Sequence, residues 1–180
     1  MTVAHPTLDL SVPAMRVLES LPEDIRAEVI YGKLFILPHP LLYHADLVMQ
    51  ITQELSLHVI SKQLGKVYCC PVGVYLLEAT NAVIPDIVFI SNNNHLTRFE
   101  SKGIFGPPDL HIEVLSPRNR THDLIRKKKL YEEAGVKEYW IIDPETKEST
   151  GYQLKEGAYG NPLLMNSKIH IRILDREITF

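Results

Sequence analysis

The sequence predicts a mixed α/β fold in a single domain that spans residues 1–180. At 180 residues and 45% hydrophobic content, one compact core is expected and a second independent domain is not. Short β-rich runs bounded by proline or glycine predict strands, and one long segment with an apolar residue every fourth position predicts a helix. A strand-helix-strand succession in the second half completes the mixed α/β pattern.

In the first half, residues 22–31 are predicted to form a helix that stops at Gly32, and residues 33–37 a short strand. Residues 41–64 are predicted to form the longest helix, with Gly65 as its C-cap. The apolar positions of this helix recur every four residues: Leu47, Ile51, Leu55 and Val59. Three β-rich runs that suit neighbouring strands follow, at residues 67–70, 72–78 and 83–90.

In the second half, the polar residues 91–106 are interpreted as one loop, and residues 109–115 as a strand. Residues 123–134 are predicted to form a helix closed by Gly135, and residues 137–143 another strand. The last third is expected to add peripheral C-terminal strands, at residues 152–154 and 169–174.

Composition narrows the function classes. No segment approaches the ~20 apolar residues that span a bilayer. The first 12 residues lack the pattern of a secretory signal, so we expect a cytoplasmic protein with a mobile N-terminal tail. Cys69 and Cys70 are adjacent, which makes a disulfide between them strained and a zinc cage from them alone impossible; they are interpreted as strand residues.

The net charge of −3 argues against broad electrostatic wrapping of nucleic acid. One short segment is basic against this acidic background: Arg118, Arg120, Arg126, Lys127, Lys128 and Lys129. Such a run is more often a solvated face than a binding site. Any contact with phosphate must therefore be local.

Asp86 interrupts the run VIPDIVFI, which is otherwise apolar on both faces. A strand of this kind is usually buried, and an ionised carboxylate in it needs a metal, an ion pair or several hydrogen-bond donors. The alternative is an aspartate that accepts backbone hydrogen bonds at the end of a strand.

In the run DLHIEVL, alternation places Glu113 on the polar face. If a neighbouring strand carries Asp86, the two carboxylates could share a hard cation such as Mg²⁺. Asp109 lies about 13 Å along the strand from Glu113, which is too far to chelate the same ion.

The helix predicted at residues 123–134 turns one lysine inward. At about 100° per residue, Lys127 falls on the buried face of this helix, whereas Arg126 and Lys129 face solvent and Lys128 lies at the margin. The apolar residues of the buried face are Leu124, Ile125, Leu130, Tyr131 and Ala134. A lysine on an apolar face either extends to water along its alkyl stem or meets a buried carboxylate. Both alternatives stay open at this point.

These segments resemble the Uma-type restriction endonucleases, a branch of the PD-(D/E)XK nuclease superfamily. The matching text is VIPDIVFI, GPPDLHIEVLSP and HDLIRKKKLYEEAGVKEYWIIDP, with weaker matches at AEVIYGKL and at His44. The resemblance covers most of the chain, from about residue 19 to the final strand. It implies a restriction-endonuclease-like central mixed β-sheet flanked by helices, with extra C-terminal β-strands.

The resemblance also implies roles for individual residues. Asp86 and Glu113 would be metal ligands, and Glu28 matches an acidic position that can support the metal. The superfamily pattern places a lysine two residues after the glutamate, but that position here is Leu115. In the Uma-type branch the lysine lies on the following helix, and Lys127 matches it. His44 also matches, with no role that the sequence explains.

The implied function is Mg²⁺-dependent hydrolysis of phosphodiester bonds in nucleic acid, with DNA as the expected substrate and Mn²⁺ expected to substitute. The cation would activate water, Lys127 would stabilise developing charge, and Arg118, Arg120 and Lys128 could contact flanking phosphates. The main alternative is a catalytically inactive binding or regulatory module with the nuclease fold. A nucleophilic hydrolase ranks lower, because no G-x-S-x-G motif is present and the cysteines have no evident histidine partner. The sequence leaves open whether the chain acts as a monomer or a homodimer.

Overall fold

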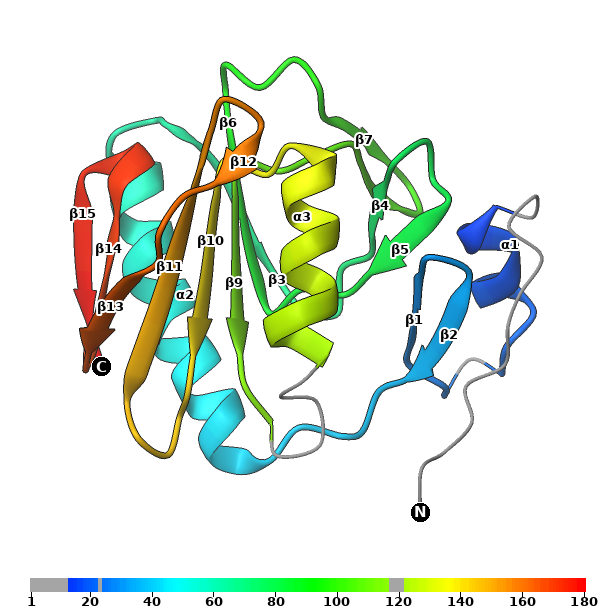
Figure 1. The fold of residues 1–180 in the computed structure, drawn as a ribbon, viewed down its shortest axis with the longest axis horizontal. Coiled ribbons are helices and arrows are strands. Elements are labelled where there is room, and N and C mark those ends of the chain that lie inside the picture. The colour runs from blue at the N-terminus through cyan, green and yellow to red at the C-terminus, as the bar shows by residue number, and fades with distance from the viewer. Residues whose placement is uncertain (1–12, 23, 117–121) are drawn as a thin grey trace.

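In the computed structural model, which describes residues 13–22, 24–116 and 122–180, a mixed β-sheet separates helices on its two faces (Figure 1). The strands of this main sheet, in spatial order, are β12 (Ala158–Tyr159), β11 (Glu148–Lys155), β10 (Glu138–Ile142), β9 (Leu110–Val114), β6 (Ile87–Ser91) and β3 (Gly65–Cys69), with β13 (Leu163–Asn166) also paired to β11. Only the β9–β10 pair within it is parallel. The predicted mixed α/β class is confirmed.

One face of the main sheet is covered by α2 (Leu42–Ser61). The helix buries the four-residue repeat that predicted it, Leu47, Ile51, Leu55 and Val59, against the alternate side chains of β6, β9 and β10. The C-terminal segment packs on the same core through β14 (Lys168–Ile171), the 3₁₀ turn η2 (Arg172–Leu174) and β15 (Arg176–Thr179). The predicted C-terminal strands are therefore present.

The opposite face carries a π-helical turn, η1 (His122–Lys127), that continues into α3 (Lys128–Ala134). Gly135 ends α3 in the left-handed conformation at φ 87°, as a glycine C-cap predicts. The buried core on this side includes Leu130 and Tyr131 of α3 and the second set of alternating strand residues. Glu113 belongs to that set, because it alternates with the α2-facing Ile112 and Val114.

A second sheet adjoins the main one (Figure 1). Its strands, in spatial order, are β2 (Lys33–Ile36), β1 (Ala27–Ile30), β5 (Asn81–Val83), β4 (Val74–Leu76), β8 (Gly103–Phe105) and β7 (Arg98–Glu100). The short helix α1 (Ala14–Glu19) packs on this sheet. Among the described helices, none is long and apolar enough to cross a membrane.

The helix predicted at residues 22–31 is wrong, because β1 occupies its second half. Gly32 is not a helix cap but half of a two-residue hairpin turn, with φ 49° at Tyr31 and 69° at Gly32, and the turn joins β1 to β2. The prediction followed the helix propensity of the residues in this segment, but the pairing of β1 with β2 and β5 outweighs that propensity in the folded chain.

Two further predictions need correction. The run at residues 83–90 is not one strand, because it breaks around Pro85 into β5 of the second sheet and β6 of the main sheet. The stretch at residues 91–106 is not one loop, because it contains β7 and β8. Asp86 therefore lies at the crossing between the two sheets, immediately before β6.

Candidate active site

Asp86 and Glu113 come from neighbouring antiparallel segments. The β6–β9 ladder pairs Ile87 with Ile112 and Val88 with His111, so its next step beyond Ile87 sets Asp86 opposite Glu113. Asp86 Oδ2 accepts a hydrogen bond from the backbone N–H of Val114 at 2.8 Å, which holds the aspartate against the end of β9. Both carboxylates are buried and line one pocket.

His44 forms the other contact of Asp86. Its Nε2 lies 3.2 Å from Asp86 Oδ2, and its side chain is buried in the first turn of α2. His44, to which no role was assigned from the sequence, thus lies against one of the two predicted metal ligands. A histidine in this position orients the carboxylate that it contacts.

Lys127 lies between two carboxylates. Its Nζ is 2.9 Å from Glu113 Oε1 and 2.9 Å from Glu28 Oε1, and only 3% of the residue is exposed. The predicted inward direction of Lys127 is confirmed, and of the two alternatives it meets buried carboxylates. The attraction between the ammonium and the two carboxylates offsets the free-energy cost of removing these charges from water. An isolated charge buried to this extent would have no such compensation.

Glu28 reaches this cluster from β1. Its Oε1 also accepts the backbone N–H of Ile84 at 2.8 Å, and none of its surface is exposed. Glu28 does not line the pocket that Asp86 and Glu113 share. It therefore lies behind the pocket wall, where it contacts two residues that line the pocket, Lys127 and Ile84.

Tyr131 also contacts Glu113. Its hydroxyl donates to Glu113 Oε1 at 2.7 Å, and burial together with the charge of Glu113 raises the pKa of Tyr131 well above its usual value. His111 packs against the Tyr131 ring at 4.2 Å between centroids. Burial and the nearby Lys127 lower the pKa of His111 to about 3, so this imidazole is neutral. Among the described residues, neither of its ring nitrogens has a hydrogen-bond partner.

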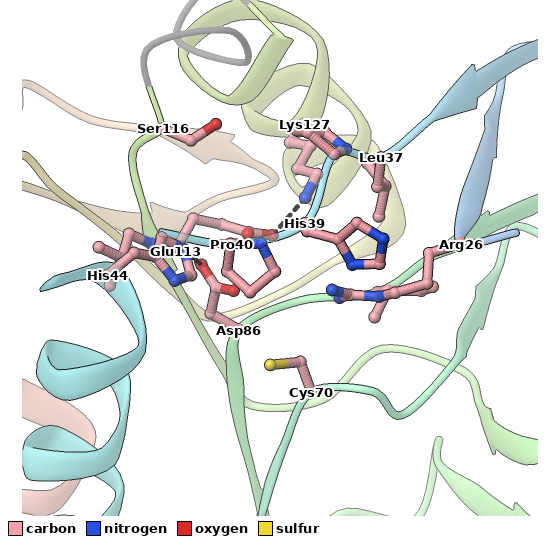
Figure 2. Close-up of a pocket in the computed structure, with 13 residues that line it drawn as sticks. Arg26, Leu37, His39, Pro40, His44, Cys70, Asp86, Glu113, Ser116 and Lys127 are labelled. Atoms are coloured by element: carbon pink, nitrogen blue, oxygen red, sulfur yellow. Dashed lines mark hydrogen bonds and ion pairs between the residues drawn. The ribbon is translucent and has the colours of Figure 1, made fainter. Parts of the chain in front are cut away.

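Figure 2 shows the pocket around these groups, with Lys127 reaching down from its helix to Glu113 and with His44 and Asp86 beside them. Arg26 and the segment that contains His39 and Pro40 also line the pocket (Figure 2). Cys70 lies below Arg26 in this view. The full lining is Arg26, Leu37, Pro38, His39, Pro40, His44, Cys70, Ile84, Asp86, Glu113, Val114, Ser116 and Lys127.

Cys70 is poorly suited to act as a nucleophile. Burial raises the pKa of its thiol, the negative charge of Asp86 raises it further, and Arg26 opposes the rise. A thiol needs the reverse environment to become a reactive thiolate. Cys69 and Cys70 are both free cysteines, and of the two only Cys69 lies in a strand, at the end of β3.

The other basic residues of the segment lie elsewhere. The Lys128 ammonium sits 4.9 Å from the centre of the Tyr152 ring and does not line the pocket, so its predicted phosphate contact stays a prediction. Lys129 is exposed and pairs with Glu133 at 3.6 Å. Arg118 and Arg120 lie outside the described residues.

The predicted burial of Ile125 is wrong, because 64% of this residue is exposed. The projection used the α-helical angle, whereas Ile125 lies in a π-helical turn, in which fewer degrees separate successive residues. The same turn leaves Lys127 buried at the start of α3. Asp109 pairs with Lys137 at 2.6 Å, outside the pocket, as its distance from Glu113 predicted.

The donor set of the pocket fits a hard divalent cation. Within the described parts of the chain, no group of three or more His, Cys, Asp or Glu side chains is arranged to enclose a metal. Mg²⁺ needs no such cage, because it is typically held by one or two carboxylates and completes its shell with waters and substrate phosphates. Asp86 and Glu113, which both line the pocket, would be such a pair of oxygen ligands.

Sequence reasoning missed several pocket residues. Arg26 directly precedes the weakly matching segment AEVIYGKL but is not part of it, and it falls within the segment that was predicted as a helix; His39 lies between that segment and His44. Tyr131 was predicted only as part of the buried face of its helix. Its spacing of four residues from Lys127 was the one available signal, because such a spacing places two side chains on the same side of a helix.

Comparison with known proteins agrees with this geometry. A family profile described as "Uma2: Putative restriction endonuclease" matches residues 13–171, and the chain belongs to this family. The fold is that of a solved structure titled a putative nuclease belonging to DUF820, from Anabaena variabilis ATCC 29413. The TM-score is 0.76 at 16% sequence identity, over 93% of this chain and 94% of that one. No curated protein matches the chain.

Proposed function

We propose that this protein is a metal-dependent endonuclease that hydrolyses phosphodiester bonds of DNA. The observation that carries the proposal is the pocket in which Asp86 and Glu113 converge while Lys127 is hydrogen-bonded to Glu113. Membership of a family described by restriction endonuclease activity supports the nuclease class. DNA as the substrate and Mg²⁺ as the cation are the finer parts of the proposal.

In this proposal Asp86 and Glu113 hold the divalent cation. When bound, such a cation polarises a phosphodiester and lowers the pKa of a coordinated water. Glu113 Oε1 already accepts hydrogen bonds from Lys127 and Tyr131, and these two donors fix the orientation of the carboxylate. His44 and the Val114 amide do the same for Asp86. The ligands are therefore held in place before metal arrives, which reduces the reorganisation that binding requires.

Lys127 stabilises the negative charge that develops on the phosphate. Its ammonium lines the pocket from the helix, and this position replaces the strand lysine that the superfamily pattern places two residues after the glutamate. Leu115 occupies that strand position and is buried in the core. We assign Glu28 a supporting role: it would act on the cation site through Lys127, which it holds at 2.9 Å.

A plasmid-nicking assay tests the proposal. Purified protein is incubated with supercoiled DNA in Mg²⁺, in Mn²⁺ and in EDTA, beside the variant Glu113→Gln. We expect nicking in either cation, none in EDTA, and none from the variant. Absence of cleavage by the wild-type protein in both cations, with DNA binding intact, would instead favour the inactive binding module.

A further inference from the structure

Arg26 is a cation of the pocket that forms no ion pair with any of the described residues. It comes immediately before β1, and its side chain lines the same pocket as Asp86, Glu113 and Lys127. Across the described chain, its guanidinium makes no hydrogen bond or ion pair, and its Nε is fully buried without a partner. Lys127 differs, because two carboxylates compensate its charge.

A buried N–H without an acceptor costs about 1–3 kcal/mol. Guanidinium groups bind phosphates with two parallel hydrogen bonds, so an incoming anionic group could satisfy Nε and a terminal nitrogen together. The acidic side of the pocket excludes an anion unless a cation is present. The Arg26 guanidinium favours an anion directly, and the one pocket therefore contains two carboxylates that suit a cation and a guanidinium that suits an anion.

We infer that Arg26 binds a backbone phosphate of the nucleic acid, next to the phosphate that Asp86, Glu113 and Lys127 act upon. This inference rests on the proposed nuclease function and names the part of the substrate that positions the reacting bond. A contact of this kind also suits a chain with a net charge of −3, because the positive charge of Arg26 that contacts the nucleic acid lies at the site itself.

Substrates with single methylphosphonates test the contact, because each replaces one charged phosphate oxygen by a methyl group. In the wild-type protein, the substitution at the contacted phosphate should lower kcat/KM about tenfold to a hundredfold, the range for a hydrogen bond to a charged group. Arg26→Gln should show a similar loss on the unmodified substrate and no further loss at that phosphate. Arg26→Lys, which keeps the charge but not the paired donors, should fall between the two.

Arg98→Gln is the matched control, because Arg98 is exposed on β7 and pairs with Glu100 outside the pocket. It should leave kcat/KM and every methylphosphonate penalty unchanged. Equal penalties in the wild-type and Arg26→Gln proteins at all positions would overturn the inference while the nuclease function stands.

A measurement without cleavage separates the two hypotheses. The Nε–Hε signal of Arg26, assigned through its loss in Arg26→Lys, should shift in a saturable way during an NMR titration with inorganic phosphate, while the Arg98 signal stays in place. If the protein cleaves no DNA, the proposed function fails and this titration alone decides the phosphate site. No shift at Arg26, or equal shifts at both arginines, would refute it.

Discussion

The ammonium of Lys127 lies 2.9 Å from Glu28 Oε1 and 2.9 Å from Glu113 Oε1, although β1, which carries Glu28, is distant in sequence from β9 and the π-helical turn. A cation between two buried anions is stable without a metal. Retention of Glu113 and Lys127 therefore does not by itself distinguish an active nuclease from an inactive relative. Asp86 distinguishes them better, because the described residues bind its carboxylate through a histidine and a backbone amide rather than through a lysine or arginine.

Replacement of Lys127 should affect both turnover and stability. We expect Lys127→Ala to lower kcat by about two to three orders of magnitude, as loss of one electrostatic stabiliser does. It should also destabilise the fold by about 3–5 kcal/mol, because Glu28 and Glu113 are left buried without their cation. Single-turnover cleavage and urea denaturation measure the two effects.

Lys129→Ala is the matched control, because Lys129 lies two residues further along and is exposed. It should change kcat less than twofold and stability by less than about 0.5 kcal/mol. Full activity in Lys127→Ala would refute the assignment of this lysine to the reaction.

Glu28→Gln separates a metal ligand from a residue that positions Lys127. The glutamine keeps an oxygen for the Ile84 amide but loses the charge next to Lys127. We expect kcat to fall about tenfold or more, while affinity for Mn²⁺, measured from the free-ion signal by electron paramagnetic resonance, stays within twofold of the wild-type value. Glu113→Gln should weaken Mn²⁺ binding strongly. Equal weakening by both substitutions would make Glu28 a direct ligand.

Asp86→Asn should abolish cleavage and leave the metal-free fold intact. Asparagine retains a carbonyl oxygen that can accept the Val114 amide, and it removes a buried negative charge. We therefore expect the melting temperature in EDTA to be unchanged or higher. Added Mg²⁺ should raise the melting temperature of the wild-type protein but not that of the variant. Cleavage by Asp86→Asn would show that the aspartate is structural.

The sequence predicted those parts of the site in which the local pattern and the final position agree. The alternation along residues 109–115 predicted the face of the strand on which Glu113 lies, and the helical spacing predicted that Lys127 points inward. Glu28 and Arg26 could not be placed in the same way, because their positions depend on the pairing of β1 with β2 and β5. The break at Pro85 and the π-helical turn at Ile125 follow from tertiary packing, which period-based reasoning does not include.

Glu138 provides a test of how the C-terminal segment is attached to the main sheet. Its buried carboxylate accepts the Trp140 indole N–H at 2.8 Å and the backbone N–H groups of Arg172 and Ile173 at 3.0 and 3.1 Å. Glu138→Gln replaces one acceptor oxygen by an NH₂ group that faces a donor. The cost in stability should be about 1–3 kcal/mol, and Glu138→Leu, which removes every acceptor, should cost more.

The control variant Glu177→Gln breaks only the exposed pair with Lys168 and should cost less than about 0.5 kcal/mol. Urea denaturation gives these values, and hydrogen exchange should show the largest loss of protection in β14 and β15. A Glu138→Leu protein as stable as the wild type would mean that apolar packing of Ile169, Ile171 and Ile178 alone holds the segment.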